Sequence, residues 1–128
     1  MGVKKTLRVM LVGDHAAFRE ALAFLLTHDD EGDLEVVAQA GSPAEARGAL
    51  ADGRLDVAVL DLVLPDGYGS DPIGELRRSN PGVSVVLLSA AMGPGDLDEP
   101  AKAGADAVLE KAESIPTIAE EVRRLGSV

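Results

Sequence analysis

The stretch DVAVLDL at residues 56–62 decides the fold. Four consecutive apolar residues lead into Asp61, without the alternation of polar and apolar residues that marks a half-buried strand. A continuous apolar run of this length is typical of a strand buried on both faces, as in parallel sheets that helices cover. The stretch therefore predicts a central strand that ends in a carboxylate.

Other apolar runs recur along the chain, and segments with helical spacing or helix-start signals separate them. Ser42 and Pro43 suit the N-cap and the first position of a helix. The expected strands are 7–12, 34–40, 56–62, 83–89 and 107–109, and the expected helices lie at about 18–26, from 42, at about 72–78 and at about 116–125.

Strands that alternate with helices predict a doubly wound α/β domain with right-handed crossovers. Five strands suit the flavodoxin-like (CheY-like) order 2-1-3-4-5, a parallel sheet with helices on both faces. The 128 residues fit one such domain, so we expect a single domain over 1–128. The segment before the last strand is not expected to form a regular helix like the other connections. Its glycines and prolines predict a short or frayed helix between about 91 and 103.

The composition excludes several kinds of partner and site. The formal net charge is -10, from 22 acidic and 12 basic side chains, so the surface should repel nucleic-acid phosphates. The chain has no cysteine, which removes disulfides and thiolate metal sites and suits a reducing compartment. No apolar stretch is long enough to span a membrane. We therefore expect a cytoplasmic protein that binds neither nucleic acid nor membrane through this domain.

Four polar side chains are expected at one edge of this sheet, because the carboxyl ends of parallel strands meet there. Asp14 follows the first strand and Asp61 ends the third. Ser89 ends the fourth strand, and the fifth runs into Lys111. Mg²⁺ takes oxygen ligands and relieves the repulsion between two carboxylates. An aspartate can attack a phosphoryl group, and a metal with a lysine neutralises the transferred charge, so the pattern predicts phosphoryl transfer to aspartate.

Several segments resemble the receiver domains of bacterial two-component response regulators, in the family's order and spacing. Three features resemble receivers that precede LuxR-type helix-turn-helix effectors: the Asp-His pair at 14–15, EVVA at 35–38 and AGAD at 103–106. This resemblance implies that 1–128 is the front of a longer transcription regulator. The matching segments are VMLVGDH at 9–15, DVAVLDLVLPDG at 56–67, VVLLS at 85–89 and AGADAVLEK at 103–111.

The resemblance implies a role for each residue that matches a family position. Asp61 matches the phosphoacceptor, which takes its phosphoryl group from a sensor histidine kinase. The chain would then be a switch that assists its own phosphorylation, not a metabolic enzyme, and phosphorylation would alter its pairing with a second copy or an effector. The other matches are the Mg²⁺ ligands Asp14, Asp61 and the backbone carbonyl of Val63, the phosphoryl contacts Ser89 and Lys111, and the switch positions Ser89 and Val108.

Three positions depart from the family pattern. Gly13 replaces the first of two acidic residues, Val108 replaces an aromatic switch residue, and Ala112 stands where many receivers carry a cis-proline. Because ligand charge helps to set the affinity for a hard cation, Gly13 predicts weak Mg²⁺ binding that Gly13→Asp should tighten.

Other functions on the same fold remain alternatives. Gly13 and Val108 favour a pseudo-receiver that works by protein contact without phosphorylation. A flavin carrier or an aspartyl phosphatase is disfavoured, because a glycine-rich phosphate loop and a second aspartate two residues after Asp61 are absent. Simpler roles are also open: Asp14 could cap the first helix, and Lys111 could form a surface ion pair.

Overall fold

The computed structural model describes most of the chain, with gaps. The helix expected between about 91 and 103 lies outside the described residues, and so does Ala112. The described ranges are 6–28, 32–49, 54–61, 63–64, 67–68, 73–89, 104–111 and 115–126.

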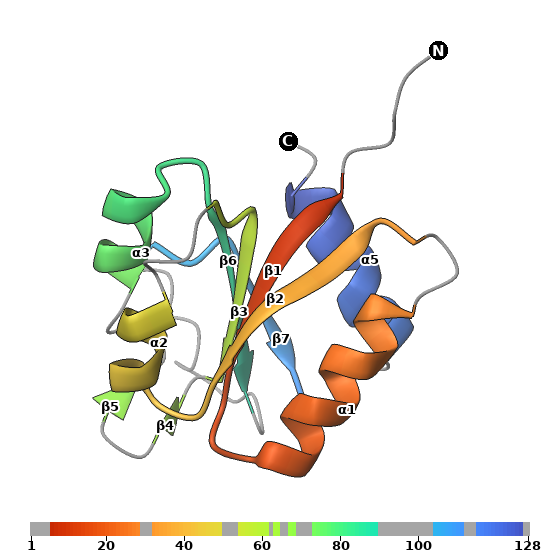
Figure 1. Cartoon of the computed structure of the whole chain (residues 1–128), viewed down its shortest axis with the longest axis horizontal. Coiled ribbons are helices and arrows are strands. Elements are labelled where there is room, and N and C mark those ends of the chain that lie inside the picture. The colour runs from red at the N-terminus through yellow and green to blue at the C-terminus, as the bar shows by residue number, and fades with distance from the viewer. Residues whose placement is uncertain are drawn as a thin grey trace.

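Strands and helices alternate along the described chain, as the apolar runs predict (Figure 1). The elements are β1 Leu7–Val12, α1 Ala16–Thr27, β2 Leu34–Ala40, α2 Pro43–Ala49, β3 Val57–Asp61, β4 Val63–Leu64, β5 Gly67–Tyr68, α3 Ile73–Ser79, β6 Ser84–Ser89, β7 Ala107–Glu110 and α5 Ile115–Gly126.

The main sheet has five parallel strands in the order β2-β1-β3-β6-β7. Counted within this sheet, that order is the expected 2-1-3-4-5, so the predicted fold is confirmed. Helices α1 and α5 cover one face, and α2 and α3 cover the other (Figure 1). Strands β1 and β3 are neighbours, with Val9 opposite Val57, which puts the two predicted aspartate-bearing strand ends side by side.

Predicted and observed limits of the main strands differ by at most one residue, and Ser42 accepts a hydrogen bond from the Glu45 N–H at 3.2 Å, as an N-cap does. The antiparallel pair of β4 and β5 was not predicted. Val63 lies opposite Tyr68 and Leu64 opposite Gly67, after the expected strand at 56–62 and before the helix expected from about 72. Strands of two residues are too short to show a periodicity, so no pattern could reveal them.

The core is aliphatic and forms one layer on each face of the sheet. Every residue of β3 is buried, as expected for a central parallel strand. On one face the sheet packs against Leu22 and Leu26 of α1 and Ile118 of α5. On the other face it packs against α2 and α3, where Leu76 is fully buried. These layers hold the strands rigidly and so fix the positions of the residues at their ends.

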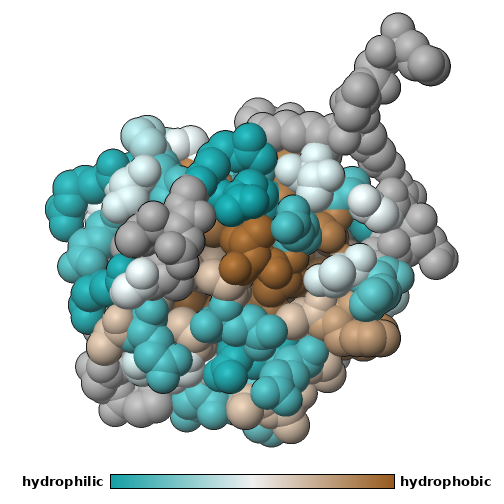
Figure 2. Space-filling view, in the orientation of Figure 1, coloured by the Kyte–Doolittle hydropathy of each residue, from teal (hydrophilic) through white to brown (hydrophobic). Residues whose placement is uncertain are grey.

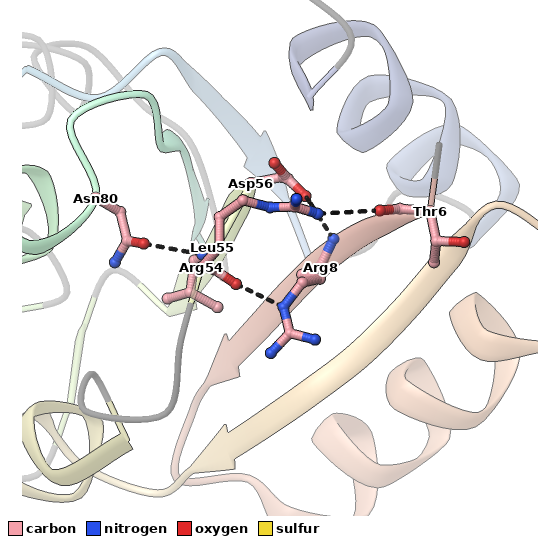
Figure 3. A network of polar contacts seen from close by, with 6 residues as sticks. All are labelled: Thr6, Arg8, Arg54, Leu55, Asp56 and Asn80. Carbon is pink, nitrogen blue, oxygen red and sulfur yellow. Dashed lines mark hydrogen bonds and ion pairs between the residues drawn. The ribbon is translucent and has the colours of Figure 1, made fainter. Parts of the chain in front are cut away.

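Polar contacts hold the amino ends of β1 and β3 together (Figure 3). The Arg8 N–H donates to Oδ2 of Asp56 at 2.9 Å, and Nη2 of Arg54 donates to the same oxygen at 3.1 Å. The Arg8 guanidinium in turn donates to the Arg54 carbonyl at 2.7 Å. The Leu55 N–H donates to Oδ1 of Asn80 at 2.9 Å. These side-chain contacts add to the backbone hydrogen bond from the Asp56 N–H to the Arg8 carbonyl, 2.8 Å long, where the two strands begin.

Some apolar side chains remain at the surface. Figure 2 shows an apolar area in the middle of the view, over the edge strand β2, with hydrophilic residues around it. Val36 and Val37 of this strand are only half-buried. On α1, Phe24 is 61% exposed and Leu25 is 45% exposed. Within the described ranges, no helix has the length and apolar character needed to cross a membrane.

Candidate functional site

The carboxyl ends of the main strands meet at the lower edge of the sheet in Figure 1. Asp61 is the last residue of β3, where it lies opposite Leu88. Ser89 is the last residue of β6, and its carbonyl accepts a hydrogen bond from the Lys111 N–H at 2.8 Å. Parallel pairing therefore brings these expected site residues to one edge.

Asp61 and Lys111 form an ion pair at the centre of this edge. Nζ of Lys111 donates to Oδ2 of Asp61 at 3.1 Å. The Asp61 side chain is 8% exposed and the Lys111 side chain 23%, so water screens the pair only in part. The surface ion pair considered for Lys111 is therefore wrong, because its ammonium points to the buried carboxylate.

The surroundings of Asp61 change its proton affinity. Burial raises the pKa of the Asp61 carboxyl above its ordinary value, although the hydrogen bond and the positive charge of Lys111 act to lower this pKa. The charge of Asp14 raises the pKa of Asp61 further, and His15 lowers it. The two carboxylates are thus close enough to repel each other, which is the condition that a bound cation relieves.

Gly13 makes a close approach to the Asp61 side chain. A Cβ atom on Gly13 would lie 2.4 Å from Oδ2 and 2.9 Å from Cγ of Asp61, far inside van der Waals contact. The Asp61 carboxylate therefore occupies space that a side chain at position 13 would need. The expectation that Gly13→Asp tightens Mg²⁺ binding must be revised, because the new side chain cannot enter unless Asp61 moves away.

Helix α1 contributes two residues, Phe18 and Arg19, that belong to none of the predicted site positions. Nη1 of Arg19 donates to the Gly13 carbonyl at 2.5 Å, and its Nε donates to Oε1 of Gln39 at 3.2 Å. Arg19, Phe18, Gly13 and Asp61 line a small hollow of about 10 Å³, which has room for about one water molecule. Phe18 and Arg19 lie in the first turn of α1, which begins two residues after Asp14, so the sequence could have placed them near the site.

The start of α1 lies beside the site. The N-cap residue of α1 is His15 and not Asp14, so the capping role considered for Asp14 is wrong. The His15 side chain itself makes no capping hydrogen bond. Asp14 is exposed and therefore accessible to an ion from solvent. The His15 and Phe18 rings stack with centroids 6.2 Å apart, and Nζ of Lys111 lies over the Phe18 ring, 5.1 Å from its centroid.

The donor atoms at this edge fit a hard cation. Asp14 and Asp61 supply carboxylate oxygens, and Val63 lies two residues after Asp61 in β4, where its carbonyl is the third oxygen of the expected set. No group of three or more His, Cys, Asp and Glu residues suited to a metal occurs within the described ranges. Among the residues that the structure describes, Asp14 and Asp61 are thus the two carboxylates of the expected set.

Two further expected positions lie on neighbouring strands. Ser89 is 4% exposed at the end of β6. Val108 is half-buried in β7 and packs against the cluster beneath α2 and α3. Val108 lies opposite Leu87, two residues before the carboxyl end of β7, and it has no polar group to offer.

Comparison with known proteins identifies the family. A family model described as the response regulator receiver domain matches residues 9–123. The chain therefore belongs to the response regulator receiver domain family. The strands β1, β3, β6 and β7, whose ends carry the site, all lie mostly or wholly within this match.

Relatives in this family include transcription regulators. The chain is 35% identical over 120 residues to the DNA-binding transcriptional activator DevR/DosR of Mycobacterium tuberculosis, which covers 94% of this chain and 54% of that protein. It is 26% identical over 119 residues to the response regulator VraR of Staphylococcus aureus, with 93% and 56% covered. The chain thus spans about half the length of the curated relatives it matches.

A solved structure agrees with the fold. The signal receiver domain of the response regulator NarL from Mycobacterium tuberculosis superposes with a TM-score of 0.82 at 27% identity. The match covers 96% of this chain and 98% of that one.

Proposed function

We propose that this domain accepts a phosphoryl group on Asp61 from a phosphohistidine of a sensor histidine kinase, with Mg²⁺ bound. The observation that carries the proposal is the buried Asp61 carboxylate at the carboxyl end of β3, with the Lys111 ammonium 3.1 Å from its Oδ2. The protein is then a phosphoacceptor switch that assists its own modification. Membership of the receiver family supports this function.

The transfer needs a nucleophile and a means of neutralising charge. A carboxylate oxygen of Asp61 attacks the phosphorus, the new O–P bond forms, and the P–N bond of the donor breaks with its electron pair leaving on the imidazole. The Lys111 ammonium is already at the carboxylate, where it can pair with a phosphoryl oxygen. The Ser89 hydroxyl, at the adjacent strand end, donates a hydrogen bond to another phosphoryl oxygen.

The carboxylates of Asp14 and Asp61 and the main-chain carbonyl of Val63 would hold Mg²⁺, which supplies positive charge for the phosphoryl oxygens. Gly13 adds no carboxylate to this set, and the Arg19 guanidinium lies on its carbonyl. Fewer negative charges at a hard-cation site reduce its affinity. We therefore expect weaker Mg²⁺ binding than at a site with two adjacent acidic residues.

The output of the switch is transcription control through a second domain. DevR/DosR is a DNA-binding activator about twice as long as the matched part, so residues 1–128 form the receiver of a longer regulator. The net charge of -10 would repel DNA, so DNA binding belongs to the other domain. Phosphorylation changes the surface around Ser89 and Val108, and with it the pairing of the domain with a second copy or an effector.

Intact mass spectrometry tests the proposal. The protein is incubated with Mg²⁺ and a small phosphoryl donor, phosphoramidate or acetyl phosphate, and the mass of one phosphoryl group should appear. Asp61→Asn is the matched control and should gain nothing. No mass gain in the wild-type protein would instead support a pseudo-receiver that acts by protein contact.

A further inference from the structure

Helix α1 carries a core-facing stripe that ends at the site. Phe18, Leu22 and Leu26 follow one another at intervals of four residues, so they lie on one face of the helix. Leu22 and Leu26 are almost fully buried, whereas Phe18 is half-buried and packs against the same cluster. Phe18 is thus the point at which the apolar stripe of α1 reaches the carboxyl edge of the sheet.

The Phe18 ring meets the charged group that neutralises Asp61. Nζ of Lys111 lies 3.1 Å from Oδ2 of Asp61 and 5.1 Å from the centroid of the Phe18 ring. The face of an aromatic ring is negative and attracts an ammonium group within about 6 Å. The ammonium therefore has a negative group on two sides, one a carboxylate and one a ring face.

A lysine needs such a second contact if it is to stay in one place. Its ammonium is a strongly hydrated point charge on a flexible stem, and water competes for it wherever the side chain reaches the surface. The Lys111 side chain is 23% exposed, so that competition is real. The stacked His15 ring, 6.2 Å from Phe18, restricts how far the phenyl ring can turn away.

We propose that Phe18 is a positioning residue, whose ring face holds the Lys111 ammonium on the Asp61 carboxylate. The inference rests on the proposed function, because it assigns Phe18 a part in phosphoryl transfer. A lysine held in place before the donor arrives needs no reorganisation when charge is transferred. Phe18 itself does not touch the reacting atoms and acts through Lys111.

Ring fluorination tests the contact without a change of shape. The chain has two phenylalanines, Phe18 and Phe24, so a ring-fluorinated phenylalanine incorporated into the Phe24→Leu variant enters at Phe18 alone. Fluorine withdraws electrons and weakens the negative ring face. The measurement is the rate at which an amine-acylating reagent modifies Lys111, read by peptide mass spectrometry. We expect roughly fivefold faster modification after fluorination, as for a contact of this kind. An unchanged rate would overturn the proposal.

Phosphorylation rates show whether the contact matters for transfer. With phosphoramidate and Mg²⁺, Phe18→Leu should slow the gain of mass roughly fivefold. Phe18→Tyr keeps a ring and should restore the rate. Phe24→Leu is the matched control, because Phe24 lies on the outer side of the same helix, 61% exposed. Equal slowing in the leucine and tyrosine variants would contradict a role for the ring face.

The two measurements separate the two hypotheses. If the wild-type protein takes up no phosphoryl group, the proposed function fails, while the labelling of Lys111 still decides whether Phe18 holds the ammonium. If phosphorylation occurs and fluorination leaves Lys111 labelling unchanged, the function stands and the role of Phe18 is rejected. Thermal unfolding of each variant shows whether a slower rate reflects loss of the fold.

Discussion

Strand β3 has an aspartate at each end, and the two carboxylates have different surroundings. Asp56, just before the strand, is 8% exposed and accepts hydrogen bonds from the Arg8 N–H and the Arg54 guanidinium. Asp61, the last residue of the strand, is also buried and accepts a hydrogen bond from Lys111. A main-chain donor is fixed by the strand, whereas a lysine can move.

The difference fits the proposed roles, a structural one for Asp56 and that of phosphoacceptor for Asp61. Other aspartates that join elements of this fold also pair with arginine: Asp33 with Arg123 at 2.7 Å, and Asp106 with Arg77 at 3.0 Å. Arginine is a planar donor suited to fixed pairs, and it keeps its charge at all ordinary pH values. Asp61 instead pairs with lysine, whose ammonium is a compact point charge that could also pair with a phosphoryl oxygen. The identity of the partner therefore fits the phosphoacceptor role that we propose for Asp61.

The largest expected effect is the loss of phosphorylation when Asp61 is changed. Asp61→Asn should abolish the mass gain with phosphoramidate and Mg²⁺, because an amide cannot act as the nucleophile. Asp56→Asn is the matched variant at the other end of the strand, and it should still be phosphorylated. Labelling that persists in Asp61→Asn would move the acceptor elsewhere and remove the contrast between the two ends.

The second effect concerns stability, for which the carboxylate that matters should be Asp56, at the start of the strand. Asp56→Ala leaves the Arg8 N–H without its side-chain acceptor and should lower the free energy of unfolding by about 2 kcal/mol. Urea denaturation monitored by circular dichroism measures this change. An Asp56→Ala protein as stable as the wild type would show that the contacts in Figure 3 add little.

A third prediction concerns the close contact at Gly13. Gly13→Ala places a methyl group where the Asp61 carboxylate lies, so the carboxylate must turn away from Lys111. A strained rotamer costs about 1 kcal/mol, so phosphorylation should slow by about fivefold. Titration of Mg²⁺ into Gly13→Ala and Gly13→Asp distinguishes this steric effect from that of charge. Tighter binding in Gly13→Asp would show that Asp61 moves readily.

The smallest effect concerns pH. Burial raises the pKa of Asp61 in the folded protein above its ordinary value of 3.8, so the folded state holds this proton more tightly than the unfolded state. The contribution of Asp61 to stability is therefore full below pH 3.8 and is lost as the pH rises through the folded-state pKa. Asp61→Asn does not ionise and should melt at a higher temperature than the wild type at neutral pH. The measured quantity is the difference in melting temperature between Asp61→Asn and the wild type. If this difference is the same at neutral and at acidic pH, the prediction is wrong.

Much of the site could be predicted because strand ends follow from local patterns. The apolar run before Asp61 marks a buried parallel strand, and the carboxyl ends of such strands meet at one edge. Asp14, Ser89 and Lys111 could be assigned to that edge on the same argument. The short strands β4 and β5 could not, because two residues carry no period.

The sequence by itself determined where the strands lie along the chain and which polar residues end them, since both depend on hydrophobic runs and on the chemistry of side chains. Only the tertiary structure decided that Asp61 fills the space beside Gly13, and that Lys111 lies between Asp61 and Phe18. Lys111 and Asp61 are 50 residues apart in the chain. Contacts of this kind depend on how closely helix and sheet pack, to within an ångström, and no local pattern of residues carries that distance.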